Sequence, residues 1–342
     1  MAWTPPPGGM LSGMPPSPPR ADWDAVVIGG GPAGLAAATW LGRYRRRTLV
    51  LDHGQHRNRH VEQAHGYLTR DPASPAEILE AARAGVERYE GVELRECEVV
   101  AVRGECGSFT VDMEDGTSVE AHRVVLASGL RDVKPEIGGF DEHYGASVFH
   151  CPACDGLEAK DQDVVVLGWS EDVAGFALEL LDWAATLAVV TNGRRFEGDE
   201  VRREALARNG IHLVEEDASS FVGTRGDLRA VRLAGGVELP CSLAFFSIEH
   251  QPRAPFADAL GCEHDEDGAL VVDDTGETSV PGVYAAGDIT PGLQLLQVAT
   301  AKGTTAGVGC ARSLRTERPL EGAPPRALVV EQELEVEPAD AS

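Results

Sequence analysis

The segment from Asp24 to Asp52, DAVVIGGGPAGLAAATWLGRYRRRTLVLD, constrains the fold more than any other part of the chain. A short apolar run from Val26 to Ile28 leads into a cluster of glycines. Helix-forming sequence follows to about Arg45, and a second apolar run ends in an acidic residue. This order predicts a β-strand, a tight turn, an α-helix and a second parallel strand, which is the basic unit of an α/β fold.

The glycine cluster is a G-x-G-x-x-G made by Gly29, Gly31 and Gly34. The first glycine permits a tight turn, the second lets a pyrophosphate approach the backbone, and the third allows close packing of the helix. Free N–H groups at the helix N-terminus favour phosphate. Asp52 ends the second strand, where a carboxylate can accept hydrogen bonds from a ribose. We therefore predict a dinucleotide site formed by Gly29, Gly30, Gly31, Pro32, Ala33, Gly34 and Asp52.

A second strand–turn–helix–strand pattern of the same length runs from Asp163 to Gly193. Between the two units we expect a helix at Pro75–Tyr89 and three strands, near 98–103, 109–113 and 122–127, that form a small antiparallel layer. Further strands are expected between 235 and 252, and a strand and a helix between 279 and 314. The predicted fold class is α/β, with two Rossmann-like three-layer domains.

Charge and composition exclude several function classes. The formal net charge of −25 argues against nucleic acid or an anionic membrane as a partner. No apolar run approaches the ~18 residues of a membrane span. The first twenty residues lack the basic and apolar regions of an export signal. We expect a disordered leader at 1–21, an acidic tail at 316–342 and a cytoplasmic protein.

Two of the seven cysteines form a unit, the Cys-x-x-Cys of VFHCPACDG. Cys151 can begin a helix with Pro152 at its first position, so that the helix N-terminus stabilises a thiolate. Asp155 follows Cys154 and can carry a proton to and from the departing thiol. A zinc site would need two further ligands, and no second Cys-x-x-Cys exists, so we predict no metal. A reduced pair of core cysteines is the other alternative to a redox-active dithiol.

A strand-end Gly-Asp also occurs far along the chain, at Gly287 and Asp288 in GVYAAGD, where the carboxylate can bind the ribityl hydroxyls of a flavin. With this motif in place, the region from about Asp22 to Leu314 resembles the low-molecular-weight, bacterial-type thioredoxin reductase family. The resemblance is carried, in the family's order, by VVIGGGPAGLAAA, VEQAHGY, SPAEILE, VVLASGL, CPACDG, SIEHQP and GVYAAGD.

The resemblance implies an FAD-binding domain formed by residues 22–132 and 252–315, into which a nucleotide-binding-like domain, residues 133–251, is inserted. It implies that Cys151 exchanges disulfides with a partner, that Cys154 faces the flavin, and that Asp155 is the acid/base. The family's Arg-Gln-Ala contact with the flavin corresponds to Leu296-Gln297-Val298, so Gln297 and Val298 are expected at FAD. The implied partner is a thioredoxin-like protein or a small-molecule disulfide or dithiol, and the implied assembly is a homodimer.

The second glycine fingerprint is altered where the family binds NADPH. Gly168 is retained, but Ser170 and Val173 replace the second and third glycines in GWSEDV. A β-carbon at residue 170 crowds the approach of a pyrophosphate. Glu171 and Asp172 place carboxylates at the helix N-terminus, where the phosphates would lie.

Two arginines, Arg194 and Arg195, follow the next strand and could bind a 2′-phosphate, but they stand two positions later than in the family. The sequence thus leaves the use of NADPH open. We predict an FAD-dependent thiol–disulfide oxidoreductase with impaired NADPH use and another carrier, such as ferredoxin, as donor. The alternatives are an NADPH-dependent thioredoxin reductase with a relaxed site, an oxygen-dependent dithiol oxidase, and a non-enzymatic flavin redox sensor.

Overall fold

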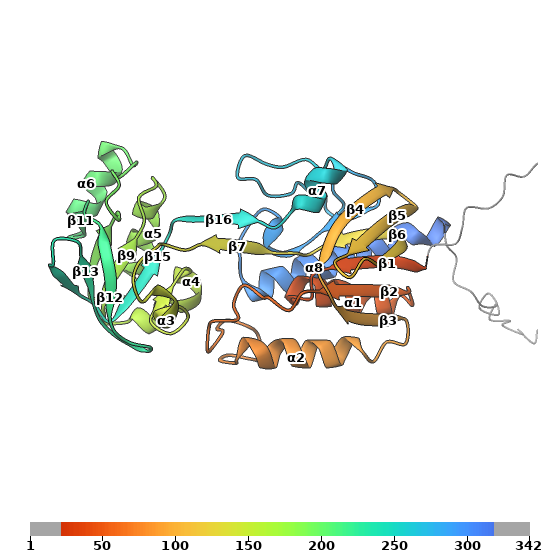
Figure 1. Ribbon diagram of the computed structural model, residues 1–342, viewed down its shortest axis with the longest axis horizontal. Coiled ribbons are helices and arrows are strands. Elements are labelled where there is room, and N and C mark those ends of the chain that lie inside the picture. Colours follow the sequence, from red (N-terminus) through yellow and green to blue (C-terminus); the bar gives the residue numbers. More distant parts are fainter. Residues whose placement is uncertain (1–21, 318–342) are drawn as a thin grey trace, which may run out of the picture.

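The computed structural model describes residues 22–317, and the predicted leader and most of the predicted tail lie outside this range. The chain forms two lobes joined by a narrow two-stranded link (Figure 1). One lobe contains the beginning and the end of the described chain, and the other contains its middle. The two lobes have separate hydrophobic cores.

The sheet of the first lobe has the strand order β3-β2-β1-β6-β5-β4, and β17 pairs with β6. Strands β1, β2, β3, β6 and β17 run parallel, whereas β4 and β5 are antiparallel additions. The strands span β1 (Trp23–Ile28), β2 (Thr48–Asp52), β3 (Val92–Glu96), β4 (Val99–Glu105), β5 (Ser108–Met113), β6 (Ser118–Leu126) and β17 (Val283–Ala285).

Helices α1 (Pro32–Arg43) and α8 (Leu296–Glu317) pack closely against each other beside this sheet, and α2 (Pro75–Val86) lies next to α1. A β-carbon on Gly303 would lie 2.0 Å from the Ala33 carbonyl oxygen, and one on Gly307 would lie 2.6 Å from that of Ala37. Glycine at these two positions is therefore what lets the last helix approach the first. The short helix α7 (Pro255–Leu260) packs near β4.

The second lobe has a five-stranded parallel sheet of order β11-β10-β9-β15-β8 and a three-stranded antiparallel sheet. The parallel strands are β8 (Val148–Phe149), β9 (Asp163–Leu167), β10 (Thr186–Val190), β11 (His212–Val214) and β15 (Leu243–Phe246). The antiparallel strands are β12 (Ala218–Thr224), β13 (Asp227–Leu233) and β14 (Glu238–Pro240). The helices are α3 (Phe140–His143), α4 (Pro152–Asp155), the 3₁₀ turn η1 (Gly156–Ala159), α5 (Val173–Leu180) and α6 (Glu200–Arg208).

The link consists of β7 (Leu130–Val133) and β16 (Glu249–Pro252), which pair antiparallel between the lobes. The domain limits expected from the sequence, at 132/133 and 251/252, fall within these two strands. The chain thus enters and leaves the second lobe side by side (Figure 1).

Both strand–turn–helix–strand units are present, and the fold class is the predicted α/β class. Two details differ from expectation. The antiparallel strands continue the main sheet through β6 rather than forming a separate layer. Strand β3 was not predicted, because its sequence, VELRE, is mostly polar and only its pairing with β2 makes it a strand.

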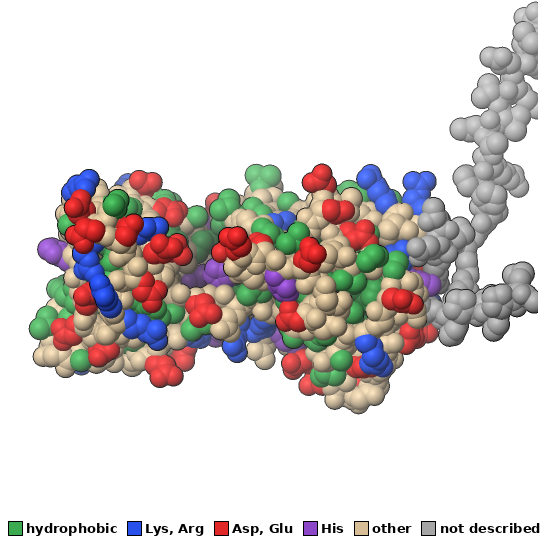
Figure 2. All heavy atoms as spheres, turned by 90° about the horizontal axis from the view of Figure 1, so that it is seen from above, with side chains coloured by type: hydrophobic (Ala, Val, Ile, Leu, Met, Phe, Trp, Pro, Cys, Tyr) green, Lys and Arg blue, Asp and Glu red, His purple; other side chains and the backbone are tan. Residues whose placement is uncertain are grey.

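The surface carries the acidic character of the composition. Acidic side chains are spread over the visible face of both lobes (Figure 2). Within residues 22–317, no helix combines the length and apolar character needed to cross a bilayer.

Candidate active site

The glycine turn between β1 and α1 has the geometry of a dinucleotide cradle. Gly29 has φ +108°, and a β-carbon on it would lie 2.3 Å from the Ala127 carbonyl oxygen, so the turn requires glycine. A β-carbon on Gly31, in contrast, would meet no atom within 4 Å. Gly31 therefore presents bare backbone to open space, as a phosphate-binding turn does.

Helix α1 begins directly after Gly31 and has no side-chain cap and no acidic residue in its first turn. Its N-terminal N–H groups are thus oriented for an anion. Asp52, at the end of β2, is buried and paired with Arg83. Its carboxylate lies against Gly30, where a β-carbon would approach to 2.6 Å, so the acid and the glycine turn are in direct contact.

The second half of the cradle comes from the other end of the chain. Strand β17 pairs with β6 and places η2 (Gly287–Ile289) beside the glycine turn. Gly287 has φ +82°, and a β-carbon there would lie 2.8 Å from that of Ala33. The carboxylate of Asp288 accepts a hydrogen bond from Arg57 at 3.2 Å.

These groups and the Cys-x-x-Cys line one cavity of about 480 Å³. The cavity is bordered by Gly29 to Ala33, Asp52, Gly287, Asp288, His150, Cys151, Cys154 and Asp155. Backbone that can bind phosphate, an acid placed to bind a ribose and an acid placed to bind a polyol thus face the same space, so the residues present fit FAD. FAD bound here would lie along the cavity that also contains the sulfur atoms.

Cys151 and Cys154 are joined in a disulfide. Cys151 caps α4, Pro152 is the first residue of that helix, and the Cys154 N–H donates to the Cys151 sulfur at 3.1 Å. An N–H directed at sulfur stabilises a thiolate at that atom once the bond is reduced. In the part of the chain that the structure describes, no group of three or more potential metal ligands is present.

Asp155 is the last residue of α4 and is 6% exposed. Burial, together with the Glu158 carboxylate and against an opposing effect of His65, raises the pKa of Asp155 to about 7. A carboxyl group with a pKa near 7 can both accept and release a proton at neutral pH. The sequence indicated the acid/base chemistry of Asp155, and the burial that adjusts its pKa appears only in the structure.

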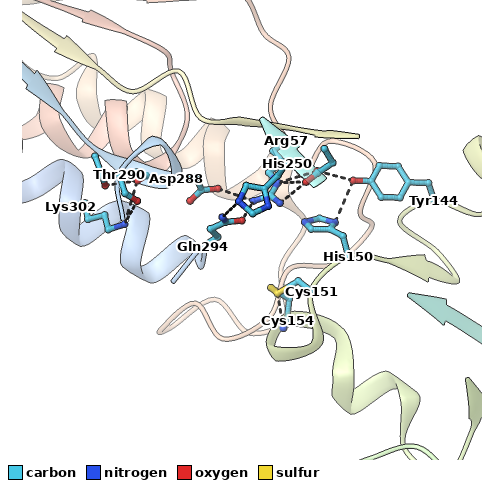
Figure 3. Close-up of polar contacts among 12 residues, drawn as sticks. Arg57, Tyr144, His150, Cys151, Cys154, His250, Asp288, Thr290, Gln294 and Lys302 are labelled. Carbon is cyan, nitrogen blue, oxygen red and sulfur yellow. Dashed lines mark hydrogen bonds and ion pairs between the residues drawn. A yellow bond between two sulfur atoms is a disulfide. The ribbon is translucent and has the colours of Figure 1, made fainter. Parts of the chain in front are cut away.

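Arg57, for which the sequence predicted no role, joins several parts of the site (Figure 3). Its guanidinium donates to Asp132 at 3.0 Å, to Asp288 at 3.2 Å and to the Gln294 side chain at 2.6 Å. These three partners come from the link strand β7, from η2 and from the segment before α8. No local pattern around Arg57 reveals them, because they are distant in sequence.

Gln297 and Val298, expected at FAD, line a second cavity of about 390 Å³ instead. The Gln297 side-chain oxygen accepts from the Leu68 N–H at 3.3 Å. The residues of this segment that border the first cavity are Gln294, Leu295, Leu296 and Ala299.

The corresponding turn of the second lobe has a different geometry. Helix α5 begins at Val173, three residues after Ser170, whereas α1 begins one residue after the equivalent Gly31. The Arg194 guanidinium lies over the Trp169 ring, 4.1 Å from its centroid. Glu171, just before the helix, pairs with Arg202 at 3.0 Å.

The fold has two Rossmann-like lobes, and one cavity both fits FAD and contains a disulfide. These features define a flavoprotein disulfide oxidoreductase. Comparison with known proteins agrees: the family described as pyridine nucleotide-disulphide oxidoreductase matches residues 23–303. The chain belongs to this family, is of the thioredoxin reductase type, and is an FAD-dependent enzyme.

Individual relatives support the same assignment. Thioredoxin reductase sirT of Leptosphaeria maculans is 30% identical over 308 residues, covering 84% of this chain and 93% of the relative. A putative thioredoxin reductase TrxB from Bacillus anthracis has a solved structure with 33% identity and a TM-score of 0.81, covering 86% and 99%. The structure of a protein named HlmI shows 36% identity and a TM-score of 0.81, covering 86% and 93%.

Proposed function

We propose that this enzyme passes electrons between FAD and an external dithiol or disulfide through Cys151 and Cys154, without NADPH as its principal redox partner. One contrast carries the proposal. The dithiol and its acid/base lie in the FAD cavity. The turn that would hold the NADPH pyrophosphate has a shortened helix preceded by two acidic residues.

The proposed thiol chemistry uses residues of this chain. A thiolate of an external dithiol attacks Cys151, the Cys151–Cys154 bond breaks, and its electron pair remains on Cys154. The second external thiol then attacks the mixed disulfide, the external disulfide forms, and the second electron pair remains on Cys151. Two protons are released, and Asp155 accepts one of them. Bound FAD supplies a two-electron acceptor or donor for the cysteine pair.

Three features at the second turn oppose NADPH binding. Relative to its glycine-type turn, α5 begins two residues later than α1 does. The N–H groups of its first turn are therefore shifted by two residues along the sequence. Glu171 and Asp172 repel phosphate at this helix N-terminus. Trp169, with Arg194 stacked on it, fills the loop with a large ring.

An NADPH-dependent enzyme with a relaxed site is the second candidate, because Arg194 and Arg195 place two cations after β10. Anaerobic titration distinguishes the two. We expect dithiothreitol to bleach the flavin absorbance and NADPH to do so at least a hundredfold more slowly. Rapid, stoichiometric bleaching by NADPH would overturn the proposal.

The electron acceptor and partner are tested separately. If oxygen is the acceptor, aerobic turnover with a dithiol produces one hydrogen peroxide per disulfide. If reduced ferredoxin is the donor, it bleaches the flavin anaerobically and supports reduction of an external disulfide. The relatives' names make a thioredoxin the first protein partner to test, alongside small-molecule disulfides. Turnover with any of these excludes a purely sensory flavoprotein.

We also propose, from the same resemblance, a homodimer located in the cytoplasm. Light scattering of the purified holoenzyme would give twice the chain mass of 36.3 kDa. Fractionation of the source cells would test the location.

A further inference from the structure

His150 directly precedes Cys151 and lines the same cavity as the disulfide. Its ring lies between Tyr144 and the two cysteines in the close-up (Figure 3). Its sequence position alone favours a surface histidine over one that assists the cysteines. The structure instead makes it part of a partly buried network of polar groups.

This polar network begins at Arg57, whose Nε donates to both carboxylate oxygens of Asp132, at 3.1 and 3.0 Å. The Tyr144 hydroxyl lies 3.3 Å from Asp132 Oδ2 and 3.4 Å from His150 Nδ1. Burial opposes ionisation of Asp132, but hydrogen bonds from Arg57 and Tyr144 and the nearby positive charge lower its pKa overall. Asp132 is therefore an ionised acceptor.

The order of donors and acceptors along this polar network determines the tautomer of His150. Burial raises the pKa of Tyr144, so its hydroxyl keeps its single proton. Because the Asp132 carboxylate can only accept, Tyr144 donates to Asp132 and its oxygen accepts from His150 Nδ1–H. Nε2 then carries the lone pair, and within residues 22–317 it makes no hydrogen bond.

We propose that His150 Nε2 is a second proton acceptor of the active site, serving the exchange at Cys151 while Asp155 serves the other thiol. The external thiol that attacks Cys151 gives its proton to Nε2, and its sulfur bonds to Cys151 as the Cys151–Cys154 bond breaks. The second external thiol gives its proton to Asp155 as the external disulfide forms. Two protons and two electrons leave the dithiol, and the two cysteine sulfurs receive the electrons.

The charges around His150 agree with this role. Burial, with the nearby Arg57 and His250 and against the opposing charge of Asp132, lowers the pKa of His150 to about 4. The ring is thus neutral at neutral pH and free to accept a proton. As the incoming external sulfur loses its proton and approaches Cys151, it develops negative charge beside the ring, which raises the proton affinity of Nε2 when the proton must move.

The inference rests on Cys151 being the interchange thiol of the proposed function, so the first test isolates that thiol. In a Cys154→Ser background, alkylation of Cys151 by iodoacetamide is followed against pH by peptide mass spectrometry, which separates Cys151 from the exposed Cys106. This readout requires no flavin turnover. Adding His150→Gln should slow alkylation at pH 7 about tenfold, because the thiolate loses its proton acceptor.

His212→Gln is the matched control, because His212 is exposed on the edge strand β11 of the same lobe. It should leave the alkylation profile unchanged. Identical profiles for the parent and His150→Gln would overturn the proposal.

The second test uses the intact cysteine pair. Reduction of the flavin by dithiothreitol, followed anaerobically by stopped flow, should slow about 10²-fold in His150→Gln, the usual contribution of a positioned base. Added imidazole should restore much of the rate to His150→Ala, whereas a structural defect would not respond. A His150→Gln rate within about twofold of wild type, or His150→Ala without rescue, contradicts the inference. A wild-type flavin that no dithiol reduces would instead overturn the proposed function.

Discussion

At the scale of single residues, burial changes the pKa values of the acidic and thiol groups of this protein. Asp155 has a raised pKa because it is buried beside another carboxylate, Glu158. The buried Cys241 and Cys310 also have pKa values raised by burial, to about 12, so they remain protonated and inert. Of these four cysteines, the reactive ones are therefore Cys151 and Cys154, which lie next to the base and in the cavity.

Asp155→Asn should slow dithiol-dependent flavin reduction by about 10²-fold and abolish the increase in rate as pH rises through about 7, because the ionised carboxylate is the proton acceptor. The pH dependence of stability gives an independent readout. A pKa raised in the folded state means that wild type loses stability as pH rises from about 4 to about 7. The variant should therefore melt at a higher temperature than wild type at pH 8, and the difference should vanish near pH 4.

The two cysteines should differ in their spectroscopic signatures. Reduced Cys151→Ser should retain a long-wavelength charge-transfer band from the Cys154 thiolate to FAD, and Cys154→Ser should lack it. Absorbance spectra of the reduced variants at pH 8 measure this directly. A band that persists in Cys154→Ser would reverse the assignment of the two thiols.

At the scale of elements, the two helix N-termini show how a small change in a turn changes the groups that it offers to a phosphate. The turn before α1 presents Gly31 and uncapped N–H groups to the cavity. The equivalent turn before α5 has Ser170, two acids and a later helix start. The fold of the second lobe survives these changes because its strands and core do not depend on the turn's phosphate-binding geometry.

Gly31→Ala and Gly29→Ala form a matched pair of substitutions. The β-carbon at 31 meets no protein atom, so Gly31→Ala should fold normally and lose at least about tenfold in FAD affinity through contact with the pyrophosphate. Gly29→Ala collides with the Ala127 carbonyl and should lower the melting temperature of the apoprotein. FAD titration and thermal unfolding of both apoproteins measure the difference. Equal FAD affinity of Gly31→Ala and wild type would contradict the placement of the phosphates.

At the scale of the whole molecule, contacts across the lobes hold the disulfide at the FAD cavity. Arg225, in the β12–β13 turn, donates to the His60 carbonyl and to the Glu62 carboxylate, both at 3.2 Å. Glu158 of the second lobe also pairs with His65 of the first at 3.3 Å. These contacts supplement the two-stranded link of β7 and β16.

Arg225→Ala should loosen the docking of the lobes and slow flavin reduction by dithiothreitol a few-fold, while FAD affinity and alkylation of Cys151 stay unchanged. Small-angle scattering should show a larger radius of gyration. Arg229→Ala is the control, because Arg229 lies on the same hairpin and, within residues 22–317, its side chain pairs only with Asp227 of that hairpin. Equal behaviour of the two variants would show that Arg225 does not hold the lobes together.

The sequence by itself determined the features that contiguous residues encode: the α/β units, the glycine turn, the Cys-x-x-Cys with its acid, and the altered second fingerprint. Only the tertiary structure brought Arg57 to Asp288, 231 residues away, and joined Asp132, Tyr144 and His150 into one polar chain. It also directed Gln297 to a second cavity and buried Asp155. The physical reason is that turn geometry and helix-terminal charge are local, whereas burial and pairing depend on which distant segments pack together.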